Sequence, residues 1–174
     1  MIDEVFRHLH RDQNLLVSVN LDSTTLDDPM FHDFVVRSLQ KSNAAALQIC
    51  FEISEKVTVN RLPRAVETIH KLRALGFRFA LDDFGSGVAS FGYLEQLPVD
   101  FVKIDGRFVQ GLYDGEVNLI VVEALTKLAI AKKIGCVAEW VETSEVMNHL
   151  KRLGIGYAQG FYLHRPEPID FSHA

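Results

Sequence analysis

Residues 77–83 of the chain, FRFALDD, form an apolar run that ends in two aspartates. A short apolar run of this kind is typical of a strand buried in a parallel sheet. The same arrangement recurs along the chain, with polar side chains at or near the end of each run. The other runs are LLVSVN (15–20), ICFEISE (49–55), DFVKID (100–105), CVAEWVE (136–142) and YAQG (157–160). The chain therefore repeats one unit, a buried strand followed by polar groups.

Segments with helical periodicity separate these runs. We expect helices over residues 1–12, from about 27 to 39, and over 62–75, 89–96, 116–131 and 144–153. The expected strands are residues 15–20, 47–53, 77–81, 99–104, 134–138 and 157–163. Strict alternation predicts an α/β fold with a parallel sheet and right-handed crossovers. Six strands suit an open sheet or three-quarters of an eight-stranded barrel, but that barrel takes about 250 residues and the chain has 174.

In either architecture the carboxyl ends of the strands open onto one face, where active sites are built. The polar groups that would meet there are Asn20, Glu52, Glu55, Asp82, Asp83, Lys103, Glu139, Glu142 and Gln159. Carboxylates that crowd together raise each other's pKa, so such a cluster calls for cations. Hard oxygen ligands suit Mg²⁺ or Mn²⁺. The sequence predicts a metal-dependent phosphoryl-transfer or hydrolytic enzyme, or the remains of one.

Composition and charge restrict the classes of protein to which the chain can belong. A hydrophobic content of 48% over 174 residues indicates one globular domain. The net charge of −5 argues against binding to bulk nucleic acid. No apolar stretch approaches the roughly 18 residues of a membrane span, so we expect no direct membrane insertion. The two cysteines lie in strand-like runs, which predicts buried thiols and a cytoplasmic location. This location also fits a domain that is part of a longer, membrane-attached sensor protein.

The motifs SVNLD, FEISE, LDDFGSG, VKID, AEWVET and YAQGF occur between Leu15 and Pro168. In order and spacing they resemble the EAL domain family of bacterial cyclic-di-GMP phosphodiesterases. The resemblance implies a TIM-like (β/α)8 barrel, of which residues 1–174 form the C-terminal three-quarters, with about six strands. It also implies two Mg²⁺ or Mn²⁺ ions, a homodimer, and hydrolysis of cyclic-di-GMP to linear pGpG.

The resemblance assigns a role to each polar group of the motifs. Asn20, Glu52 and Asp82 are similar to ligands of the first metal. Asp82 would bridge the two ions, and Asp83 would serve the second.

Lys103 resembles the lysine that holds the attacking water, and Glu139 the carboxylate that acts as the base. Glu55 resembles the glutamate that anchors the loop after Asp83 and couples dimerisation to metal binding. Glu142 and Gln159 resemble further residues lining the site. Glu142 also directly precedes the expected start of a helix, where acidic residues are favoured in any protein.

The chain departs from the family pattern at two places. The Glu-Ala-Leu segment that gives the family its name lies on a strand before Asn20, and this sequence begins after it. We expect the first metal to lack one carboxylate, the barrel to remain unclosed, and turnover by these 174 residues to be very weak. Second, Trp140 stands where the family has glycine, and its ring could stack on a guanine base or obstruct the pocket.

Two other functions compete with hydrolysis of cyclic-di-GMP. One is a non-catalytic module that binds cyclic-di-GMP or a protein partner. The chain keeps every acidic ligand that its length allows, which favours catalytic ancestry. The other is an unrelated metal-dependent barrel hydrolase, which the match across six separate motifs disfavours.

Overall fold

The computed structural model describes residues 5, 6, 9, 15–42, 44–55, 62–85 and 91–168, with residues 23 and 91–93 described by their backbone only. Within this part of the chain, six strands form one sheet in the order β1-β2-β3-β4-β5-β6. They are β1 (Val17–Leu21), β2 (Ile49–Ser54), β3 (Arg78–Phe84), β4 (Phe101–Ile104), β5 (Gly135–Ala138) and β6 (Tyr157–Ala158). Every neighbouring pair is parallel. Sequential parallel order is the order of a (β/α) barrel.

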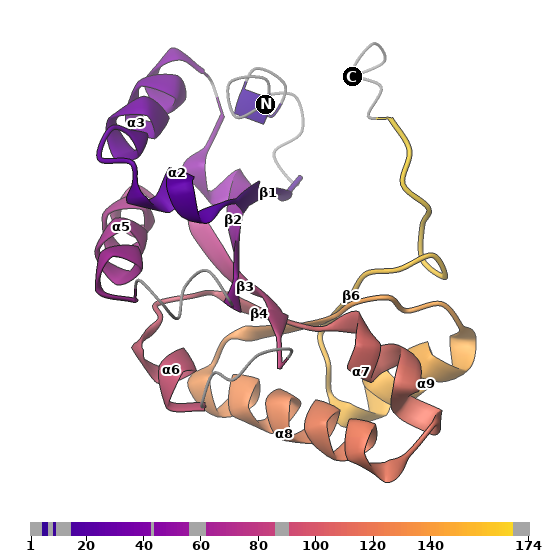
Figure 1. Cartoon of the computed structure of the whole chain (residues 1–174). Helices are drawn as coiled ribbons and strands as arrows, with labels where there is room; N and C mark the ends of the chain where they lie inside the picture. Colours follow the sequence, from indigo (N-terminus) through magenta and orange to yellow (C-terminus); the bar gives the residue numbers. More distant parts are fainter. Residues whose placement is uncertain are drawn as a thin grey trace.

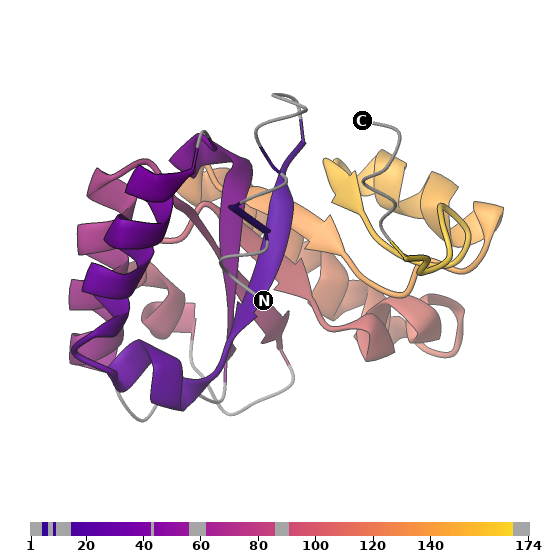
Figure 2. The same cartoon turned by 90° about the horizontal axis from the view of Figure 1, so that it is seen from above.

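The sheet is curved, and the helices cover its outer side (Figure 1). Figure 2 shows the same arrangement from above. Leu16 and Ser18, at β1, line the same inner cavity as Tyr157 and Ala158 of β6, although these strands are opposite edges of the sheet. The fold is therefore an incomplete α/β barrel, as the resemblance to the EAL domain family implies, and not the open sheet that the alternation of elements also allows.

The helices follow the strands in sequence. They are α2 (Ser23–Asp27), α3 (Phe31–Lys41), α5 (Leu62–Ala74), α6 (Phe91–Gln96), α7 (Gly106–Gln110), α8 (Glu116–Lys132) and α9 (Ser144–Leu153), with 3-10 turns at Ala46–Gln48 and Gly111–Tyr113. Most of the expected helix over residues 1–12 lies outside the described residues. The helix expected from about residue 27 begins at Phe31, and the short α2 precedes it.

Helix α9 shows how local sequence sets the ends of an element. Thr143 is its N-cap, and its Oγ1 accepts a hydrogen bond from the backbone N–H of Val146 at 3.3 Å. Gly154 ends the helix with a φ of 85°, a left-handed conformation that glycine adopts without a steric penalty. Both ends agree with the sequence prediction.

The last strand is shorter than predicted, since β6 ends at Ala158 rather than at residue 163. Beyond it the chain wraps over the end of β5. The N–H of Val141 donates to the carbonyl of Gln159, and the N–H of Tyr162 donates to the carbonyl of Val141. A Cβ on Gly160 would lie 2.3 Å from backbone atoms of Val141, so only glycine allows this close approach.

Strand alternation divides the apolar core between the two faces of the sheet. Phe51 and Phe79 belong to the large core cluster, and their ring centroids are 5.5 Å apart. Cys50, Ala80 and Phe101 form a separate small cluster on the other face. Both cysteines are buried free thiols, and burial raises their pKa, to about 12 for Cys50 and about 11 for Cys136. None of the described helices is long and apolar enough to cross a membrane.

Candidate active site

The inner face of the sheet carries the polar groups predicted from the sequence. Two residues beyond Cys50, Ala80 and Phe101 along their strands are Glu52, Asp82 and Lys103, and period-two alternation places these on the same inner face. Glu139 directly follows β5. A cavity of about 360 Å³ runs along this face and is lined by Glu52 and Lys103 among others.

Lys103 is the centre of a buried cluster of charges. Its Nζ lies 3.0 Å from Oε2 of Glu52, 2.8 Å from Oδ1 of Asp82 and 2.8 Å from Oε1 of Glu139. Burial alone would lower the pKa of Lys103, but hydrogen bonds to Asp82 and Glu139 and the charge of Glu52 outweigh it. The pKa of Lys103 is therefore raised, and its ammonium stays charged among three carboxylates.

A second grouping overlaps the first. Asp82, Asp83 and Glu139 each offer one carboxylate oxygen, and these oxygens lie within 4.8 Å of one another. Asp83 has a φ of 54°, and the β3–β4 register shifts between Leu81 and Phe84. A β-bulge of this kind re-aims a side chain, here at the end of a strand. The donors are all hard oxygens, which fit Mg²⁺ or Mn²⁺.

Glu139 belongs to both groupings. Burial raises the pKa of its carboxyl group, the ammonium of Lys103 partly offsets that effect, and the charges of Asp82 and Asp83 raise the pKa further. The sequence prediction gave Glu139 the role of a base and did not count it as a metal ligand. Nothing in the spacing shows that Glu139 meets Asp83, because the bulge that re-aims Asp83 leaves no sequence signal.

The other predicted residues lie around this centre. Asn20 of β1 is exposed and pairs in register with Glu52. Glu142 and Gln159 line a neighbouring cavity of about 230 Å³, and Gln159 also lines the inner cavity. Glu55 is buried, with 1% of its surface exposed, and its Oε2 accepts a hydrogen bond from the N–H of Gly85 at 3.1 Å.

Glu55 therefore holds the backbone just after the two aspartates, and we predict that it acts through this contact. Glu55→Ala should leave the Gly85 N–H without this acceptor, at a cost of about 1–3 kcal/mol in the free energy of unfolding. Exchange of the Gly85 amide with deuterium should accelerate, and Mn²⁺ affinity should fall. Glu67→Ala, on the exposed side of α5, is the control. A variant that loses metal while residues 83–85 stay unmoved would instead make Glu55 a direct ligand; residues 86–90 lie outside the described chain.

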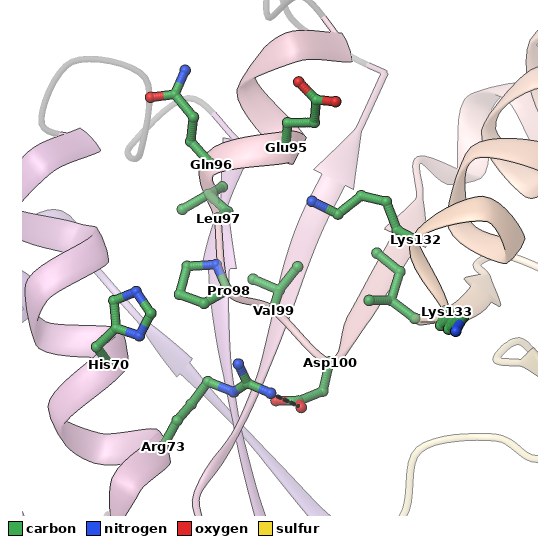
Figure 3. Close-up of a pocket in the computed structure, with 11 residues that line it drawn as sticks. His70, Arg73, Glu95, Gln96, Leu97, Pro98, Val99, Asp100, Lys132 and Lys133 are labelled. Carbon is green, nitrogen blue, oxygen red and sulfur yellow. Dashed lines mark hydrogen bonds and ion pairs between the residues drawn. The ribbon is translucent and has the colours of Figure 1, made fainter.

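A larger cavity, of about 520 Å³, lies at the opposite ends of the strands, where Asp100 and Ile134 come just before β4 and β5 (Figure 3). Three of its charged side chains have partners within the chain. Arg73 forms an ion pair with Asp100 at 2.7 Å, and Lys132 donates to the carbonyl of Leu94 at 2.6 Å. Size alone would favour this cavity, but the clustered carboxylates and the buried lysine favour the inner face as the active site.

The sequence matches the EAL domain family over residues 1–166. The chain belongs to this family. Cyclic di-GMP phosphodiesterase PdeB of Shewanella oneidensis is 40% identical over 157 residues, which are 90% of this chain and 18% of that protein. Cyclic di-GMP phosphodiesterase PdeA of Borreliella burgdorferi is 34% identical over 154 residues, 88% of this chain and 23% of that protein. This EAL domain chain thus spans about a fifth of the length of these relatives.

Solved structures agree with the family. PaMucR phosphodiesterase, in a c-di-GMP complex, superposes with a TM-score of 0.91 at 28% identity, over 96% of this chain and 70% of that one. The FimX EAL domain from Pseudomonas aeruginosa bound to c-di-GMP gives 0.89 at 29% identity, over 98% of this chain and 71% of that one. An EAL domain fold follows from these matches.

Proposed function

We propose that this EAL domain hydrolyses cyclic-di-GMP to linear pGpG with the help of two divalent ions, Mg²⁺ or Mn²⁺. The observation that carries the proposal is the contact of Lys103 with Glu52, Asp82 and Glu139, beside the oxygens of Asp83. A binding module needs no such concentration of buried acids around one lysine. A catalyst that must hold cations and move a proton does.

Each residue has a task in this reaction. Asp82, Asp83, Glu52 and Asn20 would hold the ions, which when bound supply Lewis-acid activation of the phosphodiester and of the attacking water. Glu139, whose raised pKa makes it a stronger base than an ordinary glutamate, accepts the proton of that water. The Lys103 ammonium, 2.8 Å from Glu139, orients that carboxylate and stabilises the negative charge that develops in the transition state.

The direct test is a single-turnover assay with the 174-residue chain in excess over cyclic-di-GMP. We expect slow formation of pGpG in Mn²⁺ and none in EDTA. Excess enzyme makes even a low rate measurable. Saturable binding of cyclic-di-GMP in Mn²⁺ without any pGpG would contradict hydrolysis and favour the non-catalytic binding module. The homodimer and the cytoplasmic location predicted from the sequence remain predictions.

A further inference from the structure

The large cavity at the opposite ends of the strands has the size and charge of a site for a small anion. Its volume of about 520 Å³ lies within the roughly 300–1,000 Å³ of small-molecule sites. Its lining includes three cations, two carboxylates and one imidazole, which are Arg73, Lys132, Lys133, Glu95, Asp100 and His70. With the imidazole neutral this lining has a net charge of +1, whereas the whole chain has −5. The cavity is therefore a positive region on an acidic protein.

Arg73 reaches the cavity from the last turn of α5, and Asp100 holds its guanidinium. Nη2 of Arg73 donates to Oδ1 of Asp100 at 2.7 Å, and the N–H of Phe79 donates to Oδ2 of the same carboxylate at 2.9 Å. The bond to Asp100 uses one of the N–H donors that a guanidinium presents in a planar fork. Further donors of this fork can bind a phosphate, whose geometry the fork matches.

Lys132 reaches the same cavity from the end of α8. Its Nζ donates to the backbone carbonyl of Leu94 at 2.6 Å, and an ammonium has further donors with which to bind a ligand. Figure 3 shows Arg73 and Lys132 extending from opposite sides toward the segment that runs from Leu97 to Asp100. Because hydrogen bonds already hold both cations, a ligand is spared much of the entropic cost of ordering them.

The segment between the two cations is apolar. Leu97 and Val99 are buried, with 2% and 4% of their surface exposed, and Pro98 lies between them. Charges attract each other more strongly beside such low-dielectric material than on an open surface. Glu95 opposes an anion only weakly, because its side chain is exposed and extends away from the Arg73–Asp100 pair in Figure 3.

Cations in the last turn of a helix are also expected without any ligand, because they face the partial negative charge of that helix end. Helix α9 ends in the same way, with Lys151 and Arg152. This effect does not explain why Arg73 and Lys132, from helices far apart in sequence, are each held in the wall of one cavity. The end of α9 therefore supplies the control for a site at the ends of α5 and α8.

We propose that this cavity binds the phosphate group of a small phosphorylated molecule, with Arg73 and Lys132 as its ligands. The several oxygens of a phosphate can accept from both cations at once. His70, one turn before Arg73 on α5, is a further polar group on the same wall. The site is separate from the proposed active site, since Asp100 directly precedes β4 whereas Lys103 lies toward the other end of that strand.

Isothermal titration calorimetry of the 174-residue chain with inorganic pyrophosphate tests the proposal. EDTA removes the divalent ions that pyrophosphate would chelate, and about 150 mM NaCl screens charges on the open surface. We expect one saturable site per chain, and weaker binding of inorganic phosphate because it carries less charge. The absence of saturable binding of pyrophosphate would overturn the proposal.

Two variants locate the bound ion. Arg73→Gln and Lys132→Gln should each weaken pyrophosphate binding by at least about tenfold, because each removes a charge-assisted contact. The matched changes at the end of α9, Arg152→Gln and Lys151→Gln, should leave the affinity within about twofold. Circular dichroism would check that each variant is folded, and Lys132→Gln keeps the Arg73–Asp100 pair should Arg73→Gln be unstable. Equal weakening by the variants of α9 would show non-specific attraction and exclude the site.

Asp82→Asn separates this site from the proposed active site. It should bind pyrophosphate as the unaltered chain does, because Asp82 lies at the other end of the sheet from the cavity. Binding that changes in Asp82→Asn but not in Arg73→Gln or Lys132→Gln would place the ion among the carboxylates and overturn the inference. Neither result depends on whether the chain hydrolyses cyclic-di-GMP.

Discussion

Asp82→Asn should reduce hydrolysis of cyclic-di-GMP by more than about 100-fold. Residues that merely support metal ligands already contribute 10–100-fold to activity or metal affinity, and Asp82 is proposed to hold both ions. The fold should survive, because Oδ1 of asparagine can still accept the hydrogen bond that Lys103 donates to Asp82 at 2.8 Å. Removing one of several crowded negative charges also relieves repulsion. The measurement is the single-turnover rate in Mn²⁺ together with the thermal midpoint.

Asp33→Asn is the matched control for this variant. Asp33 is an exposed aspartate in the first turn of α3, with 63% of its side chain exposed. It should keep the rate of the unaltered chain. Near-normal hydrolysis by Asp82→Asn would remove the two-ion assignment, whereas an unfolded Asp82→Asn would show that Asp82 is mainly structural.

The second large effect is expected on stability. Lys103→Met leaves Glu52, Asp82 and Glu139 together without their shared ammonium. Removing one partner of a buried ion pair costs about 3–5 kcal/mol, because the remaining charge is uncompensated. In EDTA the free energy of unfolding should fall by about this amount, and hydrolysis should be lost. Addition of Mn²⁺ should restore part of the lost stability, since cations replace the missing charge.

Lys71→Met provides the comparison, because Lys71 pairs with Glu67 on the surface of α5. Exposed pairs contribute little, so its urea midpoint should barely change. If Lys103→Met is as stable as Lys71→Met in EDTA, the three carboxylates do not depend on the lysine and must be partly protonated instead.

Much of the site could be predicted because of strand periodicity. Glu52, Asp82 and Lys103 each end or nearly end an apolar run, and parallel order brings such positions to one face. The contacts could not be predicted. The contact of one ammonium with three carboxylates depends on the register of β3 against β4, and this register shifts at a bulge after Leu81.

Elements that are short, or whose ends depend on tertiary contacts, could not be predicted from sequence patterns either. Helix α7 has five residues, which are too few for a periodic apolar pattern. Its start is set by the side chain of Asp105, which accepts a hydrogen bond from the N–H of Arg107. The early end of β6 depends on Gly160 lying against Val141. The contact between Trp140 and Gly106 joins residues 34 positions apart, and the local sequence at neither residue predicts it.

The lysine at the centre of the site also sets its charge balance. Glu52, Asp82, Asp83 and Glu139 with Lys103 sum to three negative charges when all five are ionised. One divalent ion would leave the centre negative, and a phosphodiester, itself an anion, would be repelled from it. A second divalent ion would make the centre positive by one charge, which a single phosphodiester neutralises. Lys103 thus makes substrate attraction depend on the second ion, so that ion loading and substrate capture would be cooperative by charge alone.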